Sequence, residues 1–382
     1  MKIDRIHFYV EDATISCDWF VKQMGFQPLA SGASCHTLTK VVNSGEVYIA
    51  LSSPLTSTSP VAQFLRLHPP GVADIVFQVS DLESIMARLV KGGAQFLQPL
   101  QKYHLAAGCL KWVKISAWGG LSHTIVERRG LSQMLALPVQ LNWTRDGVKI
   151  AATPTPLPLH SDELSTNNQQ PALFTKIDHV VLNVAAGNLV KAVQWYQDLF
   201  GFQPQQIFTI ETEQSSLCSQ VMVHPATGMQ FPINEPTSAN SQIQEFLDVN
   251  RGSGIQHIAL ATNNIVAAIA QLRRQGVSFL EVPLDYYTQL QQRCPKGELP
   301  CAEWQEIIAQ QILVDWQEES PEALLLQTFT QPIFNQPTFF FEVIERRFQA
   351  KGFGEGNFRA LFEAIEREQI KRGSLGKLMA ND

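Results

Sequence analysis

The chain has 382 residues, of which 45% are hydrophobic and 17% are charged, so it is long enough for two domains and can bury a core. Its formal net charge of −6 and the lack of a dense Lys/Arg cluster argue against a nucleic-acid groove or a footprint on an anionic membrane. With no secretory signal pattern, no 18-residue apolar run and six scattered cysteines without a CxxC pair, we expect a cytoplasmic protein with reduced thiols.

The first predicted element is an alternating strand over residues 2–10, "KIDRIHFYV". It is followed by an amphipathic helix with an aromatic pair, a Gly stop and a new strand. The same order begins again at "KIDHVVLNV", residues 176–184, and Trp19, Phe20 and Gly25 correspond to Trp195, Tyr196 and Gly201 at an offset of 176 residues. The opening strand and helix are therefore present twice.

Two further segments repeat in the same way. Residues 71–97 align without gaps with residues 254–280 at an offset of 183, and "HTIVERR" (123–129) matches "FFEVIERR" (340–347). Self-similarity on this scale indicates a domain duplication and not a short-period solenoid. We expect each half to be built of βαβββ-type units with helices on one face, which is the α+β class.

The duplication also predicts the domain boundaries. An N-terminal domain over residues 1–135 and a C-terminal domain over 173–382 flank a linker at 136–172 that is rich in Pro, Ser, Asn and Thr. The tail over 353–372 has glycines before a run with apolar residues at helical spacing, so it predicts a Gly-hinged loop that enters an amphipathic helix.

Three positions at equivalent strand sites carry the chemistry. In the C-terminal half they are His179, His257 and Glu342. Two imidazoles and one carboxylate suit non-haem Fe(II), and the lack of a thiolate disfavours a structural zinc site. Each residue alone could be structural; their coincidence at repeat-equivalent positions favours a metal site.

The N-terminal half has lost all three ligands. The matching positions hold Arg5, Asp74 and Thr124. We expect Arg5 and Asp74 to form an ion pair that fills the vacated site, so the chain would bind one iron and not two.

The C-terminal half strongly resembles the 4-hydroxyphenylpyruvate dioxygenases of the vicinal-oxygen-chelate superfamily over about residues 174–375. The resemblance depends on the ordered motifs "IDHVVLNV", "FPINEP", "SQIQEFL", "GIQHIAL", "LLLQTFTQP", "FFFEVIERR" and "GFGEGNFRALFEAIEREQ". It implies two vicinal-oxygen-chelate domains of paired βαβββ modules with curled mixed sheets and a C-terminal gating helix. It also implies that His179, His257 and Glu342 bind Fe(II), and that 4-hydroxyphenylpyruvate and O₂ are converted to homogentisate and CO₂.

The same resemblance assigns residues around the metal. It implies neutral amide and hydroxyl groups in catalysis, at Gln242, Gln256, Gln327, Asn234 and Ser219. It implies substrate contacts, including aromatic walls, from Phe329, Phe340, Phe353, Phe358, Asn357 and Pro232. A homodimer or tetramer is a further expectation from the family. Four histidines match no motif, and we interpret them as structural or surface residues: His7, His104, His123 and His224.

Two segments depart from the family pattern, and three other functions compete. Residues 286–311, which contain Cys294 and Cys301, and the acidic stretch before Gln327 are less similar to the family. A 4-hydroxymandelate synthase would use the same site and substrate, but Phe329 and Asn234 favour attack on the ring. An extradiol dioxygenase is disfavoured by the "GFGEGNF" gate, and a non-catalytic sequestering protein by the intact triad.

Overall fold

A computed structural model describes residues 1–105, 108–130, 134–135, 142–145, 148–149, 157–158, 172–212, 214–293, 301–317, 320–352 and 354–374. Most of the predicted linker lies outside these ranges, as do Cys294 and Phe353. No helix among the described residues is long and apolar enough to cross a membrane.

The N-terminal part of the chain forms a ten-stranded mixed sheet, in the order β11-β10-β2-β3-β4-β1-β5-β8-β7-β6. Strands β9 and β12 form a separate two-stranded sheet. The helices of this part are α1 (Ala13–Lys22), α2 (Pro60–Leu67) and α3 (Leu82–Lys91). The strands are β1 (Lys2–Tyr9), β2 (Gln27–Ala33), β3 (Thr37–Ser44), β4 (Val47–Pro54), β5 (Gly71–Val79), β6 (Phe96–Leu105), β7 (Gly108–Ser116), β8 (Ser122–Arg129), β9 (Met134–Leu135), β10 (Asn142–Arg145), β11 (Val148–Lys149) and β12 (Leu157–Pro158).

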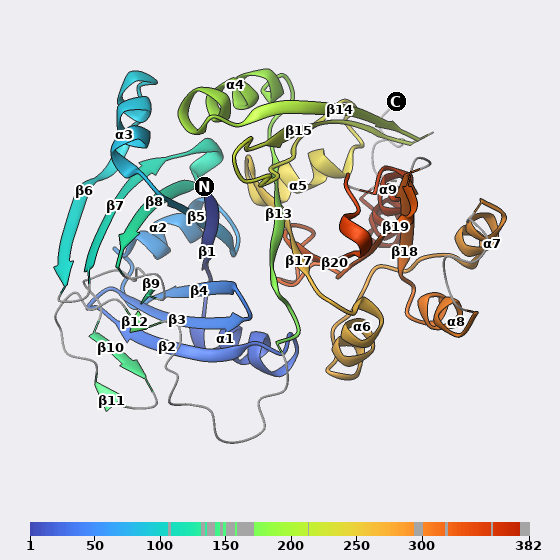
Figure 1. Ribbon diagram of the computed structural model, residues 1–382, viewed down its shortest axis with the longest axis horizontal. Helices are drawn as coiled ribbons and strands as arrows, with labels where there is room; N and C mark the ends of the chain where they lie inside the picture. Colours follow the sequence, from blue (N-terminus) through green and yellow to red (C-terminus); the bar gives the residue numbers. More distant parts are fainter. Residues whose placement is uncertain are drawn as a thin grey trace.

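The C-terminal part forms an eight-stranded mixed sheet, in the order β14-β15-β16-β13-β17-β20-β19-β18. Its strands are β13 (Lys176–Asn183), β14 (Gln203–Glu211), β15 (Ser216–Val223), β16 (Ile233–Pro236), β17 (Gly254–Ala261), β18 (Leu313–Gln317), β19 (Ser320–Phe329) and β20 (Phe340–Arg346). Its helices are α4 (Leu189–Phe200), α5 (Gln242–Asn250), α6 (Ile265–Arg274), α7 (Leu284–Arg293), α8 (Cys301–Ala309) and α9 (Glu355–Arg372). Figure 1 shows the two sheets side by side, with β1 and β13 toward the middle of the molecule.

The two sheets repeat one topology. In each, the first strand pairs in parallel with the fourth and antiparallel with the fifth, and the fifth pairs in parallel with the last strand of its unit. The register repeats as well: Arg5 lies opposite Val76 as His179 lies opposite Ala259. The predicted α+β class and the duplication of βαβββ units are confirmed.

The segment that departs from the family pattern corresponds to an addition to this plan. Helices α7 and α8 stand between α6 and β18, whereas in the N-terminal half α3 leads directly to β6. The predicted C-terminal helix is confirmed as α9, which contacts β18, α5 and β14. The cysteines among the described residues, including Cys301, are free.

One hydrophobic core runs through both halves. Phe8 of β1 packs edge-on against Phe339 with ring centroids 5.0 Å apart, and Phe77 of β5 lies 5.5 Å from Phe200 of α4. Phe20 of α1 likewise lies 5.9 Å from Phe341 of β20, so α1 and α4 each contact the sheet of the other half. Residues of the C-terminal sheet also line a cavity.

Candidate metal centre and active site

The three predicted ligands lie on adjacent strands and share one face of the C-terminal sheet. His179 on β13 is opposite Ala259 on β17, and Ala259 is opposite Glu342 on β20. His257 precedes Ala259 by two residues and therefore points to the same face, because side chains alternate along a strand. The repeat thus brings together three residues that are separated by 78 and 85 positions in the sequence.

The ligand atoms face one another in a buried space. Glu342 Oε2 lies 3.1 Å from His179 Nε2 and 3.7 Å from His257 Nε2. One ligand atom from each residue lies within 4.8 Å of the others, and all three residues are buried. Two imidazole nitrogens and a carboxylate oxygen at this separation can hold one metal ion.

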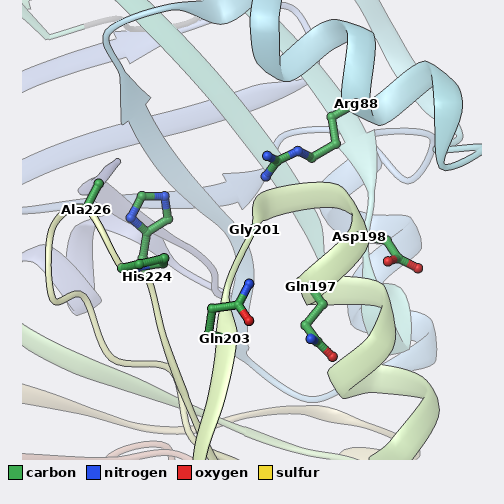
Figure 2. A pocket seen from close by; sticks show the side chains of 8 residues that line it. Arg88, Gln197, Asp198, Gly201, Gln203, His224 and Ala226 are labelled. Atoms are coloured by element: carbon green, nitrogen blue, oxygen red, sulfur yellow. The ribbon is translucent and has the colours of Figure 1, made fainter.

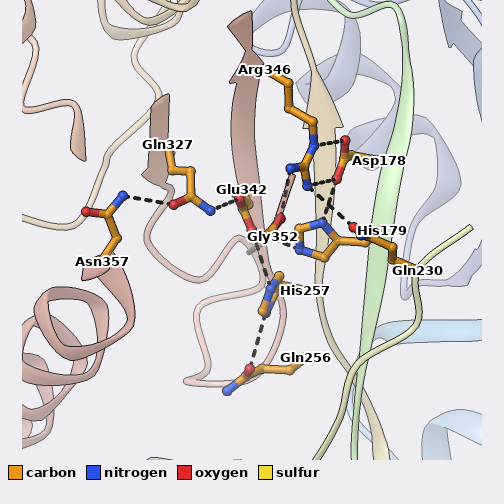
Figure 3. A network of polar contacts seen from close by, with 10 residues as sticks. All are labelled: Asp178, His179, Gln230, Gln256, His257, Gln327, Glu342, Arg346, Gly352 and Asn357. Carbon is orange, nitrogen blue, oxygen red and sulfur yellow. Dashed lines mark hydrogen bonds and ion pairs between the residues drawn. The ribbon is translucent and has the colours of Figure 1, made fainter. Parts of the chain in front are cut away.

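Each ligand is oriented by a neighbouring side chain (Figure 3). His179 Nδ1 donates to the Asp178 carboxylate at 2.9 Å, and Gln327 Nε2 donates to Glu342 Oε1 at 2.8 Å. His257 Nδ1 lies 3.2 Å from Gln256 Oε1, which only accepts. Both imidazoles therefore carry hydrogen on Nδ1 and turn Nε2 toward Glu342, so that Nε2 is the nitrogen placed to bind a metal.

The electrostatics of the site favour a cation. Burial alone would lower the pKa of His179, but the carboxylates of Glu342 and Asp178 raise it to about 9. Burial, and then the nearby His179, hold the pKa of His257 well below its ordinary value, so that this imidazole keeps a free lone pair. Burial alone would raise the pKa of Asp178, but hydrogen bonds from Arg346 and His179 lower it. The donor set and its charge balance fit a divalent metal.

A cavity of about 60 Å³ opens beside the triad. This is far below the roughly 300–1,000 Å³ of an ordinary small-molecule site, because side chains of α9 fill the space. The α9 residues that line it are Phe358, Leu361, Phe362 and Ile365.

Most of the predicted site residues lie around this cavity. Phe340 instead stacks on the His257 ring, with centroids 4.8 Å apart and an interplanar angle of 18°. Asn357 donates from Nδ2 to Gln327 Oε1 at 3.0 Å. Phe353 lies outside the described residues. The predicted residues that line the cavity, besides the triad, are Ser219, Pro232, Asn234, Gln242, Gln256, Gln327, Phe329 and Phe358.

Sequence reasoning missed two groups of residues. The apolar lining also includes Val181, Ile210, Leu217 and Ile243, which the alternation of their strands and the helical period of α5 could have indicated. The second group is Asp178 and Arg346: Asp178 accepts a hydrogen bond from His179, and Arg346 donates to Asp178. A signal existed for this pair, since "KID" and "ERR" recur in both halves.

The equivalent place in the N-terminal sheet is filled by charge, but not as predicted. Arg5 Nη1 pairs with Asp4 at 3.2 Å, and Asp74 lies 3.6 Å from Lys114 Nζ. The expected ion pair between Arg5 and Asp74 is therefore wrong. Lys114 is the repeat equivalent of Phe329, because they lie opposite Thr124 and Glu342 respectively. The partner of Asp74 is Lys114 on β7, a strand that the comparison of repeated motifs did not include.

The histidines that match no motif lie away from the triad. His7 Nε2 is buried 2.7 Å from Ser52 Oγ, and His123 Nε2 is buried 2.9 Å from the Tyr196 hydroxyl. His104 is exposed. His224 lies in a wide, open hollow of about 700 Å³ that also includes Arg88 (Figure 2). None of the triad residues lines that hollow.

Comparisons with known proteins define the class. Residues 2–107 and 176–295 match the family model of the glyoxalase/bleomycin resistance protein/dioxygenase superfamily. The chain is thus a member of this superfamily, with the matched domain present twice.

The family within this superfamily follows from individual relatives. An uncharacterized protein of Synechocystis is 35% identical over 96% of this chain and 97% of its own length. The 4-hydroxyphenylpyruvate dioxygenase of Dictyostelium discoideum is 37% identical over 97% of this chain and 99% of its own. A mutant 4-hydroxymandelate synthase from Streptomyces coelicolor superposes with a TM-score of 0.80 at 27% identity, over 96% of this chain and 98% of its own. This chain belongs to the 4-hydroxyphenylpyruvate dioxygenase family and is a dioxygenase of that type.

Proposed function

We propose that the protein binds Fe(II) through His179, His257 and Glu342 and converts 4-hydroxyphenylpyruvate and O₂ to homogentisate and CO₂. The observation that carries the proposal is the buried triad at the wall of a cavity lined by neutral amides and aromatic rings. The full-length similarity to 4-hydroxyphenylpyruvate dioxygenase supports the choice of substrate.

The cavity offers groups that suit a phenol with a keto-acid side chain. Gln242 Oε1 is buried and has no hydrogen-bond partner among the described residues, so it can accept a hydrogen bond from a phenolic hydroxyl. Asn234 is held by Asn183, to which its Nδ2 donates at 3.2 Å. Phe329 presents its ring edge-on to His257 at 6.3 Å and can bound a substrate ring beside the metal ligands.

The protein's own contribution is positioning and exclusion of water. Bound Fe(II) would supply the redox chemistry that O₂ requires. Asp178, Gln256 and Gln327 hold the ligand side chains in place, and α9 closes the cavity over them. Closure of this kind keeps solvent from a reactive centre.

The C-terminal helix α9 acts as the gate of this site. In the closed cavity its side chains occupy the space that a substrate would need, so substrate entry requires α9 to move. Truncation after Gly352 should therefore abolish turnover or uncouple O₂ uptake from product formation. Full and coupled activity of the truncated chain would remove this role.

The direct test is O₂ uptake by Fe(II)-loaded protein with 4-hydroxyphenylpyruvate, with products identified by chromatography and mass. Homogentisate with one CO₂ for each O₂ is expected, and His179→Ala serves as the inactive control. A lack of uptake by the loaded native chain would overturn the proposal.

A second candidate is 4-hydroxymandelate synthesis, which the structural similarity to a mutant of that synthase favours. The same product assay separates the two functions. Phe329 and Asn234 line the cavity and support ring attack, so homogentisate should dominate. 4-Hydroxymandelate as the main product would reverse this assignment.

A further inference from the structure

One guanidinium, that of Arg346, contacts both the support of a metal ligand and the loop that leads to the gate. Its Nε and Nη2 donate to the two oxygens of Asp178 at 2.8 and 2.7 Å. Its Nη1 donates to the backbone carbonyls of Gly352 at 2.8 Å and Ala350 at 3.1 Å. Since Asp178 orients His179, a short chain of contacts joins the proposed metal ligand to Gly352, which precedes α9 in the chain (Figure 3).

The segment that Arg346 holds is conformationally strained. Phe348 and Gln349 have φ angles of 46° and 60°, in the left-handed region that non-glycine residues rarely adopt. Such conformations are strained and persist only where surrounding contacts hold them. Phe348 is 78% exposed, so its own side chain contributes little packing. The contacts from Arg346 to the following carbonyls are placed to offset this strain.

A second link ties the same loop to another ligand. Asn357, at the start of α9, donates to Gln327, which donates to Glu342. The Asn357 Oδ1 in turn accepts from the Tyr286 hydroxyl at 2.8 Å. Ala350 and Gly352 are therefore linked to the support of His179, and Asn357 is linked to the support of Glu342.

The N-terminal half provides an internal comparison. Arg128, the repeat equivalent of Arg346, pairs with Asp4 at 2.7 Å, so an Asp–Arg pair belongs to the shared framework. Within the described residues, however, the Nε and Nη2 of Arg128 have no hydrogen-bond partner. Asp4 also pairs with Arg5, at the position where Asp178 contacts His179 in the C-terminal half. The framework explains the pair in both halves, but it does not explain the carbonyl contacts of Arg346.

We infer that Arg346 is a positioning residue that couples occupation of the metal site to closure of α9. This inference rests on the proposed metal function. A metal bound to His179 would fix this imidazole and, through it, the Asp178 carboxylate. The carboxylate holds the Arg346 guanidinium, and the guanidinium orders the backbone of residues 350–352. Such coupling is reciprocal, so an ordered loop also favours metal binding.

The test compares Arg346→Gln and Arg346→Lys with the matched control Arg128→Gln. Fe(II) affinity is measured anaerobically by competition with a chromogenic chelator. Hydrogen–deuterium exchange of the 350–358 segment is measured with and without Fe(II). Thermal unfolding followed by circular dichroism checks that each variant is folded.

In the native protein, Fe(II) should slow exchange in 350–358. Arg346→Gln should weaken Fe(II) binding by about 10- to 100-fold, the range for loss of a residue that orients a ligand, and its loop exchange should no longer respond to the metal. Arg346→Lys retains one charge for Asp178 but lacks the second fork of donors. It should keep most of the affinity and still lose the loop response, while Arg128→Gln should behave like the native protein.

Two results would overturn the inference while leaving the proposed function intact. One is native Fe(II) affinity and native loop response in both Arg346 variants. The other is an equal change in Arg128→Gln, which would make the pair purely structural. If the native chain takes up no Fe(II), the proposed function fails and the coupling fails with it. Metal-free exchange then still reports whether Arg346 anchors the loop.

Discussion

The two sheets of this molecule share their topology but differ at one row of inward-facing side chains. In the C-terminal sheet this row holds His179, His257 and Glu342 around a cavity. In the N-terminal sheet, Asp74 accepts hydrogen bonds from Ser122 at 3.0 Å and Thr124 at 2.6 Å and is paired with Lys114. A few substitutions on a fixed framework thus separate a group of side chains that can hold a cation from one that neutralises its own charge.

What both halves retain belongs to the framework. Glu127 accepts from the backbone nitrogen of Leu82 at 2.7 Å, and Glu345 accepts from that of Ile265 at the same distance. In each half a buried carboxylate on the last strand therefore caps the helix of its own module. In the shared "ERR" motif the Glu caps the helix and the first Arg pairs with an Asp of the first strand. The positions of the triad are not part of this framework and differ between the halves.

The largest expected effect comes from the row itself. Glu342→Gln should reduce turnover of 4-hydroxyphenylpyruvate by at least roughly 10³-fold, because an anionic ligand and its partner Gln327 are both disturbed. The matched change Thr124→Ala should leave iron content and turnover unaltered. Metal analysis with O₂ uptake measures both. Equal losses in the two variants would mean that the halves do not differ in function.

Charge neutralisation in the N-terminal sheet can be tested separately. Lys114→Met should lower the free energy of unfolding by about 3 kcal/mol, because it leaves the buried Asp74 without its cation. The double change Asp74→Asn with Lys114→Met should recover most of that loss, and iron content should stay native in both. Chemical denaturation gives the energies; a single variant as stable as the native protein would contradict the account.

A contact between the halves should make stability depend on pH. His123 contacts Tyr196, as Phe341 contacts Phe20 at the equivalent place. Burial lowers the pKa of His123 from about 6.5 to about 4, so between these pH values the unfolded chain binds more protons than the folded chain, and stability is lost as the pH is lowered. From pH 6.5 to 4.5 the native protein should lose about 2 kcal/mol more than His123→Phe with Tyr196→Phe. Parallel pH profiles in denaturant would show that His123 is not the cause.

The smallest effect concerns two glycines with similar backbone angles. Gly354 has φ +72°, and a Cβ there would overlap the Gln327 side chain; Gly93 has φ +71° and open space around it. Gly354→Ala should lower turnover about tenfold, or about 1.4 kcal/mol. Gly93→Ala should cost about 1 kcal/mol of stability and leave turnover unchanged. Steady-state kinetics measures the effect on turnover, and thermal unfolding measures the effect on stability. Equal turnover in the two variants would show that the close approach of Gly354 to Gln327 does not matter for activity.

The sequence was sufficient for features that depend on strand periodicity and repetition. The triad could be predicted because a ligand row depends only on which face each strand residue takes. The fit of Phe340 against His257, the bond from Asn357 to Gln327 and the ion pair of Lys114 depend on how side chains meet across strands and helices. Such contacts are set by register and packing, which the motifs alone do not specify. The wrong pairing of Arg5 with Asp74 has this origin.

The most direct test of the central claim is the number of Fe(II) ions that each chain binds. Anaerobic titration of the metal-free protein should give one equivalent for the native chain, none for His257→Ala, and one for the matched Asp74→Asn. Two equivalents in the native chain, or one that survives His257→Ala, would contradict the assignment of the metal site to the C-terminal sheet.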